Sequence, residues 1–122
     1  MRPAAALMIV LGNNGTLLGV SRPNDPHDFG LPGGSVEPGE NPQLAAIREC
    51  REETSLVVTK VKELDHSVYR DRNIHLFLAL EWSGEPRRSD EGVVAWVSWE
   101  TLGRGKYGDY NQRIAALFLG AK

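Results

Sequence analysis

Four glutamates between residues 40 and 53 could together hold a divalent cation. Glu49, Glu52 and Glu53 lie close together in the sequence, and Glu40 precedes them. If this stretch is helical, at about 100° per residue, the three later acids fall on one arc of its surface. Like charges at such spacings cost roughly 0.2–0.5 kcal/mol per pair. Local stability therefore does not account for the acidic arc, whereas a hard cation that binds carboxylate oxygens would.

The acids need a helix to position them, and the sequence marks its ends. Asn41 is a favoured N-cap residue and Pro42 suits the first helical position, which predicts a helix from Pro42 to Thr54. Ala45, which is small and lies on the acidic arc, would leave room for the ion. The alternative is a solvated charged face in which neighbouring arginines pair with the acids.

Two glycines before this helix, Gly33 and Gly34, let the backbone approach a ligand closely and turn a carbonyl toward an ion. Together with the acids they form a segment that resembles the signature of the Nudix hydrolases, which cleave nucleoside diphosphates linked to another group. The matching positions are Gly34, Glu40, Arg48, Glu49, Glu52, Glu53 and Leu56. So many constrained positions are far more specific than an isolated glycine-rich loop.

Two positions of the segment differ from the family pattern. Cys50 stands where an aliphatic residue is usual, and a buried free cysteine behaves as a small hydrophobe. Ser55 stands where the family has glycine. A glycine just after a helix usually has a left-handed backbone, which costs another residue roughly 1–2 kcal/mol. We therefore expect Ser55 either to be strained or to follow a helix that ends in another geometry.

The resemblance implies a role for each acid. It implies a set of metal ligands: the Gly33 carbonyl, Glu49, Glu52, Glu53 and Glu91. The expected ion is Mg²⁺, with Mn²⁺ as its substitute, because Mg²⁺ suits carboxylates that leave room for water and phosphate oxygens. Glu40 would orient the site and Arg48 would hold the acids in place. Either Glu49 or Glu53 would activate the attacking water, and coupled carboxylates leave that choice open.

Outside this segment the chain is similar to MutT-type nucleoside triphosphate pyrophosphatases at a thinner set of positions. Arg22, Arg72 and Asn111 are implied to bind the nucleotide, and Gly34 allows its close approach. Asn111 is the candidate for reading the base, because an amide can both donate and accept hydrogen bonds. The alternatives are a hairpin-tip charge for Arg72, a helix cap for Asn111 and a solvated loop acid for Glu91.

The implied reaction is metal-dependent hydrolysis of a nucleoside diphosphate linked to another group. The first candidate substrate is a (deoxy)nucleoside triphosphate, cleaved to the monophosphate and pyrophosphate, and the true substrate could be a modified nucleotide. The alternatives are another linked diphosphate (a nucleotide sugar, a dinucleoside polyphosphate or an RNA 5′ end) and a non-catalytic, nucleotide-binding Nudix domain. Loss of an acid from the segment would favour the non-catalytic domain, and none is lost.

The composition is that of one globular domain spanning residues 1–122. A net charge of −2 argues against binding to long nucleic acid, and no stretch approaches the roughly 20 apolar residues of a membrane span. The single cysteine rules out an internal disulfide, so we expect a reducing compartment, the cytoplasm. The expected partner is a small-molecule nucleotide, and the expected state is a monomer or a homodimer.

The apolar pattern predicts an α+β fold. Strands are expected at residues 5–11, 16–20, 57–69, 74–82 and 93–98, with the first two forming a hairpin. Residues 21–28 are expected to form a polar loop at the rim of the site, and residues 70–73 to connect two antiparallel strands. A helical turn near Trp99 and a closing helix at about 110–119 follow. With the acidic helix, these elements predict the Nudix fold, a mixed β-sheet sandwiched between helices.

Overall fold

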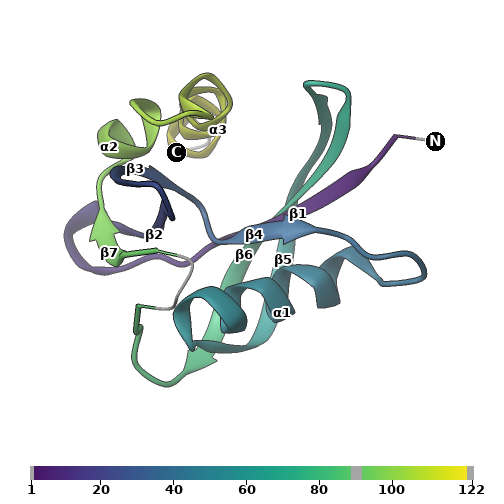
Figure 1. The fold of residues 1–122 in the computed structure, drawn as a ribbon, viewed down its shortest axis with the longest axis horizontal. Coiled ribbons are helices and arrows are strands. Elements are labelled where there is room, and N and C mark those ends of the chain that lie inside the picture. The colour runs from purple at the N-terminus through teal and green to yellow at the C-terminus, as the bar shows by residue number, and fades with distance from the viewer. Residues whose placement is uncertain (1, 89–91, 121–122) are drawn as a thin grey trace.

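The structure, a computed structural model, describes residues 2–88 and 92–120 (Figure 1). Its strands are β1 (Ala4–Ile9), β2 (Leu17–Arg22), β3 (Asp25–Gly30), β4 (Gly33–Ser35), β5 (Val57–Tyr69), β6 (Arg72–Ser83) and β7 (Val94–Val97). Its helices are α1 (Pro42–Thr54), α2 (Trp99–Gly103) and α3 (Gly108–Gly120), with a 3-10 turn at Asn13–Gly15. Within the described ranges, no helix has the length and apolar character needed to cross a membrane.

The strands form two sheets. The larger has the order β4-β1-β6-β5, in which β1 runs parallel to β6 and antiparallel to β4. The smaller is antiparallel, with the order β3-β2-β7. The mixed sheet lies between α1 on one side and α2 with α3 on the other (Figure 1). The predicted sandwich of helices around a mixed sheet is confirmed, and the separate second sheet is an addition to it.

Side chains of β1 alternate between the two halves of the core. Ala6 and Met8 pack with Cys50 of α1 on one face, and Ala5 and Ile9 pack with α2 and α3 on the other. Both faces are buried because helices cover both, so β1 reads as a continuous apolar run rather than an alternating one.

The predicted hairpin of the first two strands forms only next to its turn and not along the strands. β1 and β2 approach each other only at their ends, where the Gly12 N–H donates to the Thr16 carbonyl at 2.9 Å and Leu11 bridges to Leu17. Both edges of β1 are already paired, with β4 and with β6. Since a strand has only two edges, β2 continues into the second sheet.

Three other predicted boundaries change. Residues 25–30 form β3 rather than a polar loop, and Pro26 is tolerated because β3 lies at a sheet edge. The connection between β5 and β6 is only Arg70-Asp71, so Arg72 belongs to the strand. α3 begins at Gly108, earlier than expected, which places Asn111 inside the helix.

Candidate active site

The helix α1 that carries the acids has the predicted bounds. The Asn41 side chain accepts a hydrogen bond from the Gln43 N–H at 2.8 Å, and Pro42 is the first helical residue. The helix ends at Thr54, and Ser55 follows it with φ = 70° in the left-handed region. The first of the two expectations for Ser55 is confirmed: it occupies the conformation that usually requires glycine.

The buried face of α1 is wider than the sequence indicated. Ala45, predicted to lie beside the ion on the acidic arc, is fully buried in the core with Ala46 and Cys50. The reason is that α1 packs closely on β1, β4 and β5, and these strands cover Ala45 as well as Ala46. Ala45 therefore supports the helix and does not line a metal site.

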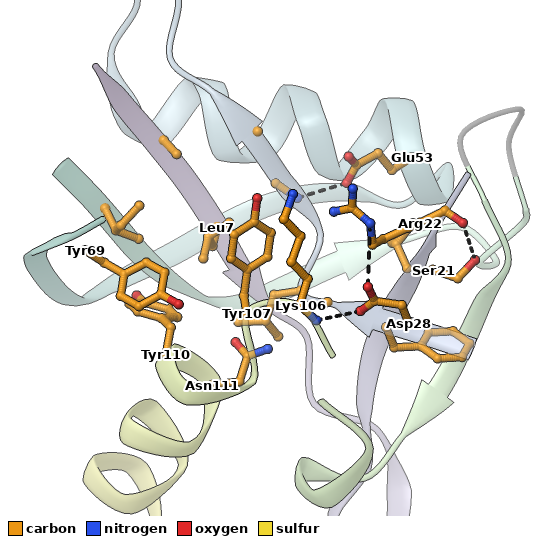
Figure 2. Close-up of a pocket in the computed structure, with 18 of the residues that line it drawn as sticks. Leu7, Ser21, Arg22, Asp28, Glu53, Tyr69, Lys106, Tyr107, Tyr110 and Asn111 are labelled. Atoms are coloured by element: carbon orange, nitrogen blue, oxygen red, sulfur yellow. Dashed lines mark hydrogen bonds and ion pairs between the residues drawn. The ribbon is translucent and has the colours of Figure 1, made fainter. Parts of the chain in front are cut away.

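A cavity of about 570 Å³ runs from α1 to α3, a size typical of small-molecule sites (Figure 2). Its lining includes Gly33, Gly34 and Glu53 at one end, and Asn111 at the other. Between these ends its wall includes three tyrosines and four cationic side chains: Tyr69, Tyr107, Tyr110, Arg22, Arg70, Arg72 and Lys106. The cavity thus joins the acidic helix to the last helix through a wall that is aromatic and positively charged.

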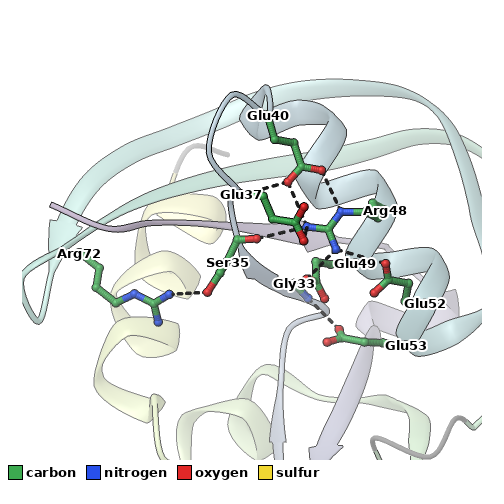
Figure 3. Close-up of polar contacts among 9 residues, drawn as sticks. All are labelled: Gly33, Ser35, Glu37, Glu40, Arg48, Glu49, Glu52, Glu53 and Arg72. Atoms are coloured by element: carbon green, nitrogen blue, oxygen red, sulfur yellow. Dashed lines mark hydrogen bonds and ion pairs between the residues drawn. The ribbon is translucent and has the colours of Figure 1, made fainter. Parts of the chain in front are cut away.

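Arg48 lies at the centre of the acidic cluster (Figure 3). Its guanidinium donates to both carboxylate oxygens of Glu40, at 2.8 and 3.0 Å, and to Glu49 at 3.0 Å and Glu52 at 3.1 Å. It also donates to the Ser35 carbonyl of β4 at 3.3 Å. One cation therefore compensates three acids and ties the helix to the neighbouring strand.

The bond to Arg48 sets the charge state of Glu40. Hydrogen bonding to Arg48, then to the Glu37 N–H, lowers the pKa of Glu40 from 4.5 to about 2. Hydrogen bonds to Glu40, then to Glu52 and Glu49, raise the pKa of Arg48 above its already high ordinary value. Glu40 is therefore ionised at any physiological pH and is committed to holding Arg48.

The two glycines of β4 make room for the acids of α1. A Cβ on Gly34 would stand 2.6–2.8 Å from the carboxylate atoms of Glu49. A Cβ on Gly33 would instead meet the Ala6 carbonyl oxygen at 2.3 Å, so Gly33 is required by the neighbouring strand. The Gly33 N–H donates to Glu53 at 2.9 Å (Figure 3). The glycine pair lets two carboxylates lie directly against the backbone of β4.

The donor set of this cluster fits a hard divalent cation. Glu49, Glu52 and Glu53 offer only carboxylate oxygens, the ligands that Mg²⁺ prefers. Glu49 and Glu52 face Arg48, and Glu53 faces Gly33. Accordingly, among the described residues no three acidic, histidine or cysteine side chains are gathered around a single point as ligands. Each glutamate has rotatable side-chain bonds, so the carboxylates can converge without a change in the helix.

The predicted nucleotide-binding residues all line the cavity, and each has a defined partner. Arg22 Nε lies 3.5 Å from Asp28 Oδ2. Arg72 donates to the Ser35 hydroxyl at 3.1 Å. Asn111 is buried, and its Nδ2 donates to the Leu102 carbonyl at 3.1 Å. Arg72 directly follows the two-residue turn between β5 and β6. Asn111 contacts the last turn of α2 rather than the start of its own helix. For both residues, the binding role and the alternative role stay predictions.

The comparison with known families decides the identity. The NUDIX domain profile matches residues 1–118. The chain is a Nudix hydrolase. Enzymes of this family act on diphosphate-linked substrates and generally need a divalent metal ion. The segment from Gly34 to Leu56 is therefore the Nudix signature, carried here by β4 and α1.

Relatives of this Nudix hydrolase differ in the substrates that their names give. It is 28% identical over 118 residues to the 8-oxo-dGTP diphosphatase of Escherichia coli, covering 91% of this chain and 92% of that protein. An ADP-ribose pyrophosphatase of Methanocaldococcus jannaschii is 41% identical over 66 residues, covering 52% of this chain and 38% of that protein. A MutT structure from a study of the Aliivibrio salmonicida and Vibrio cholerae proteins matches the fold with a TM-score of 0.82 at 21% identity, covering all of both chains.

The structure brings most predicted site residues of the Nudix hydrolase together and adds others. Glu91 lies outside the described residues, so its place at the metal site stays a prediction. Sequence reasoning missed Asp28, Tyr107 and Lys106, which line the same cavity. No spacing marks them, because they come from segments far apart in the chain that meet only in the folded protein. The catalytic and binding roles of the predicted residues likewise stay predictions.

Proposed function

We propose that this Nudix hydrolase cleaves a (deoxy)nucleoside triphosphate to the monophosphate and pyrophosphate. The observation that carries the proposal is the continuity of the cavity from Glu53 to Asn111. A nucleotide has a polyanionic end and a flat, hydrogen-bonding end. The cavity has Glu53 of the acidic helix at one end and the buried amide of Asn111 at the other. Tyrosines along the wall suit the sugar and base between them.

The acids of α1 would hold the metal ion, which we propose to be Mg²⁺ with Mn²⁺ as a substitute. Glu49, Glu52 and Glu53 are the proposed ligands, with the Gly33 carbonyl and Glu91 completing the set. When bound, the ion neutralises phosphate charge and stabilises the departing oxygen. Arg48 and Glu40 would keep the acids of the signature in place without contacting the substrate, since neither lines the cavity.

One acid should also accept the proton of the attacking water. Glu49 and Glu53 are the two candidates, and Glu53 is the one that lines the cavity. Its Oε1 accepts the Gly33 N–H at 2.9 Å, which fixes the carboxylate beside β4. We therefore propose Glu53 as the general base and Glu49 as a ligand only.

The similarity to the 8-oxo-dGTP diphosphatase covers nearly the whole chain, so an oxidised purine triphosphate is the first modified substrate to test. The experiment compares 8-oxo-dGTP and dGTP with ADP-ribose, a nucleotide sugar and a dinucleoside polyphosphate, each with Mg²⁺, and identifies products by phosphorus NMR. We expect monophosphate and pyrophosphate from the triphosphates. Orthophosphate and diphosphate as main products, or faster cleavage of ADP-ribose, would reject the proposal.

The control for this experiment is the variant Glu52→Gln. Glu52 is half exposed and pairs with Arg48 near the surface, so losing its charge should cost at most about 1 kcal/mol of stability. We expect a folded protein without turnover. If Glu52→Gln keeps most of its activity, Glu52 is not part of the metal site. If Glu52→Gln loses both its activity and its fold, the second control is Glu53→Gln, which keeps an oxygen acceptor for the Gly33 N–H.

A further inference from the structure

The cavity has a second charged wall, which the Nudix signature does not supply. It is formed by β2, β3 and the loop between α2 and α3, and it presents Arg22 and Lys106. Figure 2 shows the Lys106 side chain extending from this loop into the cavity, toward Glu53 and the Arg22 guanidinium. Two cations from separate segments therefore point to the end of the cavity where the acids of α1 lie.

The backbone of Lys106 is held on both sides of the residue. Its N–H donates to Asp28 Oδ1 at 2.9 Å, and its carbonyl accepts from Arg70 at 3.4 Å. The preceding Gly105 lies so close to β3 that a Cβ would stand 2.4 Å from Asp28 Oδ1 and 2.8 Å from the Phe29 carbonyl oxygen. The loop is thus fixed against β3, and the Lys106 side chain leaves from a defined point.

Asp28 contacts both the Arg22 side chain and the Lys106 backbone. Its Oδ1 accepts the Lys106 N–H and its Oδ2 lies 3.5 Å from Arg22 Nε, while its side chain is only 18% exposed. The negative charge of Asp28 compensates the positive charge of Arg22. In the part of the chain that the structure describes, no carboxylate lies within ion-pair distance of Lys106 Nζ, which contacts the Tyr107 ring at 5.5 Å. This wall therefore carries a net positive charge that faces into the cavity.

We propose that Lys106 binds the phosphate chain of the substrate, and that Asp28 is a positioning residue that sets both Lys106 and Arg22. The inference rests on the proposed function only in naming a nucleotide as the source of the phosphates. Three glutamates on α1 repel a polyphosphate unless cations compensate, and a metal ion on their side leaves the outer phosphate oxygens without partners. The Lys106 ammonium and the Arg22 guanidinium on the other wall would be those partners, through charge-assisted hydrogen bonds to the phosphate oxygens.

The test compares Lys106→Gln with Arg104→Gln, a matched control on the same loop. Arg104 pairs with Glu100 at 3.1 Å on the surface and does not line the cavity. Binding to each protein with Mg²⁺ is measured for three probes: inorganic pyrophosphate, the α,β-methylene analogue of dGTP, and deoxyguanosine. We expect Lys106→Gln to weaken the first two about tenfold or more and to leave deoxyguanosine unchanged. Lys106→Arg should restore most of the loss, and Arg104→Gln should behave as wild type.

The outcomes separate this inference from the proposed function. Wild-type protein that binds pyrophosphate but cleaves no triphosphate would reject the function, and a loss of pyrophosphate affinity in Lys106→Gln would still support the inference. Unchanged pyrophosphate and analogue affinities in Lys106→Gln would overturn it, as would an equal loss for deoxyguanosine.

The role of Asp28 is tested by Asp28→Asn, which keeps an oxygen acceptor for the Lys106 N–H and removes the charge facing Arg22. A positioning role predicts a KM for the triphosphate raised about fivefold or more with kcat nearly kept, and unchanged deoxyguanosine affinity. A fall in kcat at unchanged KM would contradict it.

Discussion

At the scale of single residues, the site depends on one arginine among four acids. Arg48 contacts Glu40, Glu49 and Glu52 and also reaches the Ser35 carbonyl. Without it the acidic arc of α1 would be destabilised by its own repulsion. Arg48 therefore offsets part of the repulsion among these acids without a metal ion.

The pair formed by Glu40 and Arg48 should make stability depend on pH. Folding lowers the pKa of Glu40 from 4.5 to about 2, so its ionised form stabilises the folded state. That contribution is complete above about pH 4.5 and is lost as the pH falls toward 2. We expect Glu40→Gln to melt at a lower temperature than wild type at pH 6, with the gap closing toward pH 2 in metal-free buffer. A gap that stays constant across this range would show that the charge of Glu40 is not what Arg48 recognises.

Asn111 presents a fixed hydrogen-bonding pattern to the cavity. Because the Leu102 carbonyl can only accept, it fixes Nδ2 on its side and leaves Oδ1 and one N–H of the amide for a ligand. We expect Asn111→Ala to narrow the ratio of kcat/KM between preferred and poor bases. Gln112→Ala is the control, since Gln112 donates to the adjacent Gly103 carbonyl at 3.0 Å from outside the cavity. Equal base preference in both variants would reduce Asn111 to a cap of α2.

At the scale of elements, the end of α1 contains a local defect that can be repaired. Ser55 has φ = 70°, and its hydroxyl makes no hydrogen bond within the described residues. Ser55→Gly should therefore stabilise the protein by up to about 1 kcal/mol, measured by urea unfolding. A destabilised glycine variant would mean that the side chain has a contact in solution that outweighs the backbone strain.

The two glycines of β4 should respond differently to the same substitution. In Gly34→Ala the new methyl group displaces the end of the flexible Glu49 side chain, so we expect stability to change by at most about 1 kcal/mol and activity to fall about 10- to 100-fold. In Gly33→Ala it meets backbone atoms of Ala6 and Leu7, which should cost roughly 1–3 kcal/mol. Thermal unfolding and initial rates, measured together, check both. Similar effects of the two variants on stability would contradict the separate roles.

Elements with local signals could be predicted, and elements defined by distant partners could not. The bounds of α1 follow from Asn41, Pro42 and the apolar spacing, all within one segment. β3 could not be recognised, because its proline and charges are typical of a loop and its strand conformation depends on pairing with β2. The residues of the site also divide into those with a local sequence signal and those without one. The acids share one helix, whereas Asp28 and Lys106 meet only because the loop before α3 packs on β3.

At the scale of the whole molecule, metal binding and folding should be coupled. An ion held by Glu49, Glu52 and Glu53 binds only the folded protein, in which β4 and α1 are adjacent, so it shifts unfolding by mass action. At an Mg²⁺ concentration of 100 times the dissociation constant the gain is about 2.7 kcal/mol. We expect the melting temperature to rise with Mg²⁺ at matched ionic strength in wild type and to stay nearly constant in Glu52→Gln. A rise of equal size in both would point to a site elsewhere.

The parallel pairing of β1 with β6 also has a consequence for the making of the protein. Ala4 to Ile9 pair with Asn73 to Leu78, so β1 waits during synthesis for a neighbour that is made some 70 residues later. At about 5–20 residues per second this is a delay of several seconds on the ribosome. Throughout that time an apolar strand, which ends up in the centre of the molecule, has one edge open to other chains. The newly made protein is therefore most exposed to aggregation, and most in need of chaperones, before its second half has emerged.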